Sequence, residues 1–258
     1  EYAVRLMELP QGVFGVSLAT FLLPTLAGLA AEKQFPEFRD NLRRGMGYLF
    51  FVNAIATAML MVLAEPMVRL LFQHGAFTAD STRRASFALM CLAPSLLTYS
   101  AVNVMARAFY ALGDTKVPMQ ISAVCLCLNI VVLLPLIFMF PKGLEAGALG
   151  VANALSSLLN VGLLSYALKR KMPKWEVQSL LRPLAGMLLA AVVAGGVAWF
   201  LHGHWVANLG YETVWLKIGE VFAPAIVAAL VYWGITAALG IREARVLFAL
   251  IRKNQAED

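Results

Sequence analysis

Long apolar stretches dominate the chain, and polar residues are concentrated in the short segments between them. A membrane-spanning helix needs about 20 predominantly apolar residues. Seven stretches reach about that length: residues 9–31, 46–64, 85–112, 117–140, 146–168, 184–202 and 221–240. None of them alternates between apolar and polar positions with period two, so the β-barrel pattern is not supported. The pattern predicts an all-α, polytopic transmembrane helix bundle of about seven spans.

Composition supports lipid as the solvent. Hydrophobic residues make up 60% of the chain, charged residues only 14%, and the mean hydropathy is +0.74. A soluble domain carries about 25% charged residues.

The three cysteines, Cys91, Cys125 and Cys127, lie inside apolar runs without a CxxC spacing, so we expect no disulfide and no metal site from them.

The cations are distributed unequally between the two sides of the predicted bundle. Successive loops alternate between the sides, which places 14 Lys and Arg on one side, 6 on the other and Arg107 within a span, for a total of 21. The positive-inside rule predicts a membrane protein with a cytoplasmic C-terminus and an outer N-terminus. The net charge of +6 is therefore not a nucleic-acid signal. An outer start without a signal peptide leads us to expect an upstream span and a larger parent protein.

Four segments describe the predicted organisation. Residues 1–168 hold five spans, residues 169–183 form a basic cytoplasmic loop broken by a proline, residues 184–240 form a terminal helix pair, and residues 241–258 form a basic amphipathic tail. Such a tail suits an anionic membrane surface. The short segment after Pro66 is too short to span and is expected to lie as a helical turn at the outer interface.

Polar residues within spans are the candidates for function, because each costs free energy unless it finds a partner or lines a cavity. Tyr99, Asn103 and Arg107 follow one another at intervals of four, so a helix places them on one stripe. Arg107 either extends toward the cytoplasmic interface or lines a hydrated cavity. Pro94, earlier in the same span, is expected to kink it.

The first apolar stretch is preceded by Arg5 and Glu8, which are three positions apart and able to pair on a helix. If the helix begins near Tyr2, Arg5 lies within it; otherwise Arg5 is a flank in the headgroups. Pro10 is expected to interrupt the α-helical hydrogen bonds. The residues alone do not decide whether Arg5 is a flank in the headgroups or part of a binding site.

The remaining polar positions carry weaker signals. Asn129 is a weak sodium candidate, although residues of this kind usually bond between helices. His202 and His204 lie at an expected outer loop, and without carboxylate or cysteine partners we expect no metal there. No HExxH, GxSxG or phosphate-cradling glycine loop occurs, so we expect no catalytic activity and no cofactor.

Four segments resemble the MurJ (MviN) lipid II flippases of the multidrug and oligosaccharidyl-lipid exporter superfamily. They are YAVRLMELPQGVFGVSLATFLLPTL, LFQHGAFT, ARAFYALGDTKVPM and GALGVANALSSLLNVGLLSYALKRK, which cover about residues 2–172 in order. The resemblance implies the second lobe of a fourteen-span transporter, comprising spans eight to fourteen. It also implies a missing N-terminal lobe as partner and lipid II, the undecaprenyl-pyrophosphoryl-MurNAc-pentapeptide-GlcNAc precursor of peptidoglycan, as the substrate.

The resemblance also implies roles for particular residues. Arg5 occupies the arginine position of the family's "YAxRL" segment, which faces a central cationic cavity, and is expected to hold the pyrophosphate. Glu8 is expected to orient Arg5, while Asn103 and Arg107 are further substrate-binding candidates. Leu133 replaces the acidic residue that some relatives place one turn after the position of Asn129, so a sodium site is doubtful and coupling to the membrane potential is the safer expectation. The terminal pair, with its small residues Gly195 and Gly196, is expected to line a groove for the lipid tail.

The resulting prediction is a lipid II flippase that works by alternating access. Two alternatives remain. One is a related exporter of another lipid-linked oligosaccharide or of drugs, which substrate competition would separate. The other is a non-transporting membrane scaffold, in which removal of charges from the Arg107 stripe would leave growth unaffected.

Overall fold

The computed structural model describes residues 2–75, 77–172, 175 and 178–245, and these residues form helices joined by short turns. The elements are α1 (Tyr2–Pro10), the π-helix η1 (Gln11–Val16), α2 (Ser17–Ala31), α3 (Phe35–Val62), α4 (Ala64–Phe72), α5 (Ala79–Leu92), α6 (Ser95–Ala111), α7 (Lys116–Met139), α8 (Ala146–Lys171), α9 (Gln178–Asn208) and α10 (Val214–Ala238). The predicted all-α fold is confirmed. The amphipathic tail lies mostly outside the described residues, because 246–258 are not among them.

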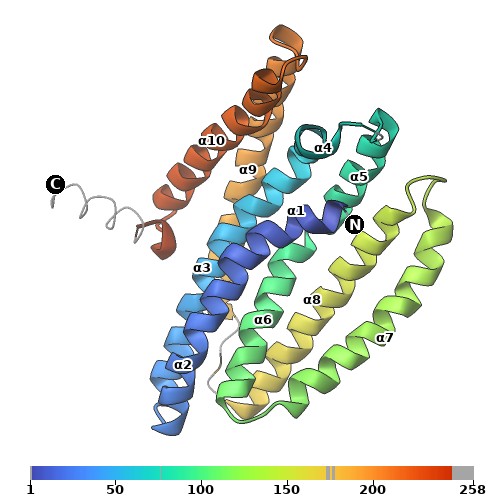
Figure 1. Cartoon of the computed structure of the whole chain (residues 1–258). Helices are drawn as coiled ribbons and strands as arrows, with labels where there is room; N and C mark the ends of the chain where they lie inside the picture. Colours follow the sequence, from blue (N-terminus) through green and yellow to red (C-terminus); the bar gives the residue numbers. More distant parts are fainter. Residues whose placement is uncertain (1, 76, 173–174, 176–177, 246–258) are drawn as a thin grey trace.

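The long helices stand side by side, with turns at the two ends of the bundle (Figure 1). α7 and α8 form a hairpin at one edge, α9 and α10 form another at the opposite edge, and α2, α3 and α6 lie between them. The terminal pair meets the rest of the molecule mainly through α9 against α3, with α10 also touching α4. The residues from α1 to α8 are called the lobe below.

Within the part of the chain that the structure describes, five helices are long and apolar enough to cross a membrane: α3, α7, α8, α9 and α10. The pair α5–α6 makes a sixth if it is one span bent by 47°. The bend lies at Ala93 and Pro94, where the sequence predicts a kink. The first predicted stretch, residues 9–31, is helical throughout but is divided between the end of α1, η1 and α2, and α2 has only 15 residues.

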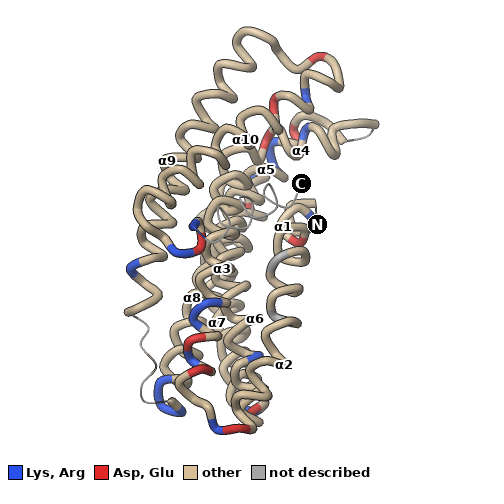
Figure 2. Tube along the Cα trace, turned by 90° about the vertical axis from the view of Figure 1, so that its left-hand side faces the viewer, with Lys and Arg blue, Asp and Glu red and all other residues tan. Residues whose placement is uncertain are grey.

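α7 shows most directly that lipid must surround the bundle. Only 6% of its most apolar stretch of 18 residues is buried, although that stretch has a mean hydropathy of 2.7. Side chains such as Val131, at 63% exposure, and Phe138, at 88%, point away from the protein. Apolar surface of this extent costs much free energy in water and none in hydrocarbon. Figure 2 shows the complementary pattern, in which charges gather toward helix ends and turns.

Two groups of buried residues hold the bundle together. The larger one joins α2, α3, α6, α8, α9 and α10, and it includes Phe38, Leu42, Met105, Phe109 and Tyr232. The smaller one lies where α1, α4 and α5 meet, and it includes Leu6, Met7 and Val68. Apolar packing therefore fixes the inward residues of α1. It also determines which residues lie on the opposite, exposed face of this helix.

An ion pair closes the end of the bundle at which α6 leads into α7. Lys171, the last residue of α8, approaches the Asp114 carboxylate in the α6–α7 turn at 2.6 Å. This hydrogen bond and that from the backbone N–H of Val117 hold the pKa of Asp114 below its usual value of 3.8. The basic stretch 169–183 is thus divided, since α8 continues to Lys171 and α9 begins at Gln178.

Candidate functional site

Arg5 and Glu8 lie on the face of α1 that points out of the bundle. Ala3, Leu6 and Met7 are buried against the lobe, so the helical period turns positions 5 and 8 outward. The Arg5 Nη1 atom lies 3.3 Å from Oε2 of Glu8, and the two side chains are 78% and 52% exposed. The arginine therefore lies within a helix that begins at Tyr2. Its guanidinium is free to meet a ligand or a partner surface.

The outward face continues from α1 through η1 into α2. Pro10 lacks a backbone N–H and ends α1, and six residues of wider π-helix follow. Along this segment and into α2 the face is apolar: Val13 is 56% exposed, Val16 is 48% exposed and Phe21 is 75% exposed. We call the exposed residues Arg5, Glu8, Val13, Val16 and Phe21 the outward face of α1–α2. Charge stands at one end of this face and apolar surface at the other.

The predicted stripe on α6 is present but does not join Arg5. Tyr99, Asn103 and Arg107 are half-buried in one helix. Arg107 is one turn from the end of α6, at the bottom of Figure 1, whereas α1 lies in the upper half of the molecule. Within the residues that the structure describes, Arg107 forms no ion pair. The structure thus separates Arg5 and Glu8 from Asn103 and Arg107, and it leaves both interpretations of Arg107 open.

The polar residues of α7 and α8 bond to each other across the hairpin. The Asn129 side-chain amide donates to the Asn153 Oδ1 at 3.0 Å, and the Ser156 hydroxyl donates to the Cys125 carbonyl at 2.8 Å. Asn129 is therefore engaged in helix pairing, as residues of this kind usually are. Among the described residues there is no group of three or more His, Cys, Asp and Glu side chains arranged to hold a metal ion.

A buried charged cluster, which the sequence analysis did not predict, connects α4 to the terminal pair. Arg69 donates from Nη1 to the Glu220 Oε1 at 2.9 Å and from Nη2 to the Glu65 Oε1 at 2.6 Å. Its guanidinium also lies 4.0 Å from the centre of the Tyr211 ring. We call Glu65, Arg69, Tyr211 and Glu220 the Arg69 cluster.

Burial makes the Arg69 cluster costly to disturb. The Glu220 side chain is fully buried, and that of Arg69 is only 11% exposed. His202 Nδ1 lies 3.6 Å from the same Glu220 oxygen, which is too long for a hydrogen bond. The expectation that His202 and His204 lie in a loop was wrong, since α9 continues to Asn208 and places both histidines in its last turns. The helix continues because the segment from His202 to Asn208 contains no proline and only one glycine.

The glycines proposed for a lipid-tail groove have different surroundings. A side chain on Gly195 would contact Val62 and Ala58 of α3 at 3.5 and 3.7 Å, so this glycine lies in the interface between α9 and α3. Gly196 is exposed, and a Cβ added at this position would meet nothing within 4 Å. Gly195 therefore serves close helix packing.

Comparison with known proteins identifies relatives over most of the chain. The family model described as "Lipid II flippase MurJ" matches residues 1–219. A probable lipid II flippase MurJ of Haemophilus influenzae is 30% identical over 95% of this chain and 48% of its own length. One from Vibrio cholerae is 31% identical over 93% of this chain and 44% of its own length. The chain thus spans about half the length of the curated relatives that it matches.

A solved structure has the same arrangement of helices. It is titled "Lipid II flippase MurJ, inward closed conformation" and superposes with a TM-score of 0.70 over 92% of this chain and 45% of its own. At 19% sequence identity this likeness concerns the fold. The family-model match over residues 1–219 carries the assignment, and the chain belongs to the MurJ lipid II flippase family.

Proposed function

We propose that this chain is the second lobe of a lipid II flippase, which moves the undecaprenyl-pyrophosphate-linked peptidoglycan precursor from the inner to the outer leaflet. The match of the family model over residues 1–219 carries this proposal. The outward face of α1–α2 supports it, because it presents a cation at the end of a long apolar surface. A lipid with a charged headgroup needs both kinds of surface.

The proposed role of Arg5 is to bind the pyrophosphate. A guanidinium presents a planar set of donors that matches two phosphate oxygens at once. Glu8, at 3.3 Å, holds Arg5 while no substrate is bound. An exposed ion pair of this kind contributes little stability, so a dianionic ligand can replace it at small cost. Asn103 and Arg107 remain secondary candidates.

Transport in this proposal needs two lobes and no covalent chemistry. The partner is an N-terminal lobe packed against the outward face of α1–α2, and alternating access exposes the cavity between the lobes to each side in turn. The membrane potential acts on the cavity arginines as the driving force, since moving one charge through 100 mV is worth about 2.3 kcal/mol. Asn129, which is bonded to Asn153, is not proposed as a sodium ligand.

The test is growth of a bacterium depleted of its own lipid II flippase, complemented by the complete protein that contains this chain. Outer-leaflet lipid II is measured directly. Arg5→Ala is expected to abolish rescue while the protein still reaches the membrane. Arg83→Ala is the matched control, because Arg83 is exposed on α5 and forms no ion pair in the described part of the chain.

Two results would contradict the proposal in different ways. Full activity of Arg5→Ala would remove Arg5 from the binding site while leaving the flippase function intact. Absence of rescue by a well-expressed wild-type protein would favour a related exporter with another lipid-linked cargo.

A further inference from the structure

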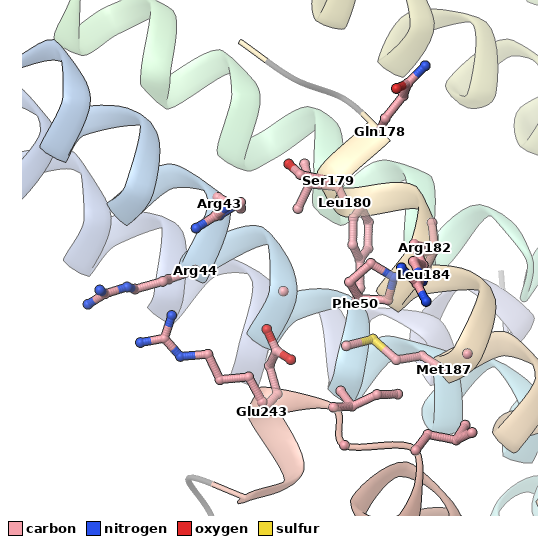
Figure 3. Close-up of a pocket in the computed structure, with 17 residues that line it drawn as sticks. Arg43, Arg44, Phe50, Gln178, Ser179, Leu180, Arg182, Leu184, Met187 and Glu243 are labelled. Atoms are coloured by element: carbon pink, nitrogen blue, oxygen red, sulfur yellow. The ribbon is translucent and has the colours of Figure 1, made fainter. Parts of the chain in front are cut away.

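A cavity of about 650 Å³ lies between the lobe and the terminal pair, and its lining residues come from outside α1 and α2. Its walls come from α3, from the first turns of α9 and from the turn after α10 (Figure 3). Four arginines and one glutamate line it: Arg43, Arg44, Arg182, Arg242 and Glu243. We call this cavity the arginine pocket. Its volume is within the range of small-molecule sites.

The cations of the arginine pocket are largely unpaired. Arg43 approaches Asp40 at 3.3 Å. Within the described residues, Arg44, Arg182 and Arg242 form no ion pair, although they come from three separate segments of the chain. Like charges around one cavity repel one another, and among the described residues only Asp40 and Glu243 place anions beside them. With Glu243 as the only acidic residue in the lining, the lining has a net charge of +3, from four arginines and one glutamate.

The turn after α10 holds one side of the arginine pocket in a fixed geometry. Gly240 adopts a φ of +73°, and the N–H groups of Ile241 and Gly240 bond to the carbonyls of Thr236 and Ala237 at 3.0 and 3.1 Å. This is the Schellman pattern that ends helices with a glycine. The Trp233 indole N–H donates to the Ala244 carbonyl at 3.2 Å, which ties the following segment back to α10. Arg242 and Glu243 lie between these anchors.

The floor of the arginine pocket is apolar. Phe50, Leu184 and Met187 line it beside the arginines (Figure 3). Next to the pocket, α9 presents exposed aliphatic side chains, including Leu188 at 42% and Leu189 at 67%. The pocket therefore combines a cationic rim with an apolar interior and an apolar flank.

The level of the arginine pocket relative to the bilayer follows from hydropathy. The apolar stretches 46–64 and 184–202 begin there, and 221–240 ends there. Three spans thus reach their polar boundary at one place, which is where lipid headgroups lie. Basic pockets between transmembrane helices at this level bind the headgroups of anionic lipids.

We infer that the arginine pocket binds the phosphate headgroup of an anionic glycerophospholipid, whose acyl chains lie along the exposed side of α9. Arg44, Arg182 and Arg242 donate to the phosphate oxygens. The lipid neutralises charges that have no ion-pair partner among the described residues, and it fills the gap between the lobe and the terminal pair at this end of the molecule. This inference does not depend on the transport of any substrate.

The test is native mass spectrometry of the full chain in a neutral detergent, titrated with phosphatidylglycerol. Arg44→Gln combined with Arg242→Gln is expected to weaken binding of the first lipid about tenfold or more. Lys169→Gln combined with Arg170→Gln is the matched control, because both residues are exposed at the end of α8 and do not line the pocket. The control is expected to stay within about twofold of wild type.

A variant that is expected to strengthen lipid binding distinguishes a loss of binding from misfolding. Glu243→Gln removes the only anion of the lining and is expected to tighten phosphatidylglycerol binding several-fold, which a damaged fold would not do. Equal weakening by the control pair, or equal binding of phosphatidylcholine, would overturn the inference. So would saturation of the pocket by inorganic phosphate. Displacement of phosphatidylglycerol by undecaprenyl pyrophosphate would assign the pocket to the polyprenyl lipid instead.

Discussion

Arg69 illustrates how much one buried charge depends on one partner. Of its two carboxylate partners, Glu220 is fully buried and Glu65 is 60% exposed. Removing the partner of a buried charge leaves that charge uncompensated, which costs about 3–5 kcal/mol. An exposed ion pair contributes at most about 1 kcal/mol. The same guanidinium therefore has one bond that stabilises the fold and one that matters little.

We expect Glu220→Ala to lower the midpoint of thermal unfolding in detergent strongly, and Glu65→Ala to change it only slightly. Each variant removes one carboxylate partner of Arg69. The difference between their unfolding midpoints therefore reports how deeply each ion pair is buried. The combination of Glu220→Ala with Arg69→Met is expected to recover part of the loss, because the charge left without a partner is then the exposed Glu65 and not a buried group. Equal effects of the two single variants would contradict the structure of the Arg69 cluster.

At the scale of elements, glycines set how closely α8 approaches α5. A Cβ on Gly150 would lie 2.7 Å from the backbone carbonyl carbon of Cys91 and from the backbone nitrogen of Leu92. Backbone atoms cannot turn aside as a flexible side chain can, so the two helices would have to separate. Overpacking of this kind costs about 1–3 kcal/mol.

Gly150→Ala is accordingly expected to lower the unfolding midpoint. Gly162→Ala, in the same helix, is the control, since nothing lies within 4 Å of a Cβ at that position. Replacing an unhindered helical glycine by alanine stabilises by about 0.5–1 kcal/mol, so the control is expected to be neutral or slightly stabilised. A gain of stability in both variants would show that helix propensity outweighs close packing in α8.

Hydropathy located the helices well but not their ends. α3 begins at Phe35, eleven residues before the predicted stretch at 46, because charged residues extend a helix beyond the hydrocarbon without breaking it. The interruption at Pro10 and the bend at Pro94 followed from missing backbone donors. The π-helical form of Gln11–Val16 could not be predicted from the sequence, because it depends on how α1 and α2 each pack against the rest of the lobe.

The candidate site could be predicted only where its residues are close together in the sequence. The outward direction of Arg5 and Glu8 follows from helical spacing and the apolar positions between them. The Arg69–Glu220 contact joins residues 151 positions apart, and a single sequence holds no signal for such a pairing. Glu220 stands immediately before an apolar stretch, where a charge ordinarily marks the flank of a span. The arginine pocket was missed for the same reason, because its arginines come from three distant segments.

For the molecule as a whole, the terminal pair is fastened to the lobe along its length. The Arg69 cluster holds one end, and the Tyr232 hydroxyl donates to the Phe51 carbonyl at 2.8 Å in the middle. Between these points, Gly195 and small side chains such as Ala194 and Ala198 allow α9 to pack closely on α3. The arginine pocket interrupts this seam at the other end. A lipid bound there would complete the contact that protein side chains make elsewhere.

The orientation of the whole bundle is the last property that charge decides. The turns after α2, α6 and α8 lie at one end, and those after α4, α7 and α9 lie at the other (Figure 1). The first set, with the C-terminal segment, carries 14 Lys and Arg, and the second, with the N-terminal segment, carries 6. This excess predicts a cytoplasmic location for the first set.

Single cysteines introduced at Glu32 and Glu212, in a variant lacking Cys91, Cys125 and Cys127, test this orientation. Both glutamates are exposed, at opposite ends of the molecule, and acidic residues contribute little to the orientation signal. A membrane-impermeant maleimide is expected to label Glu212→Cys in intact cells and Glu32→Cys only after permeabilisation. The reverse pattern would place the arginine pocket at the outer leaflet. The headgroup would then have to come from that leaflet, because the three spans that end at the pocket fix its depth but not its side.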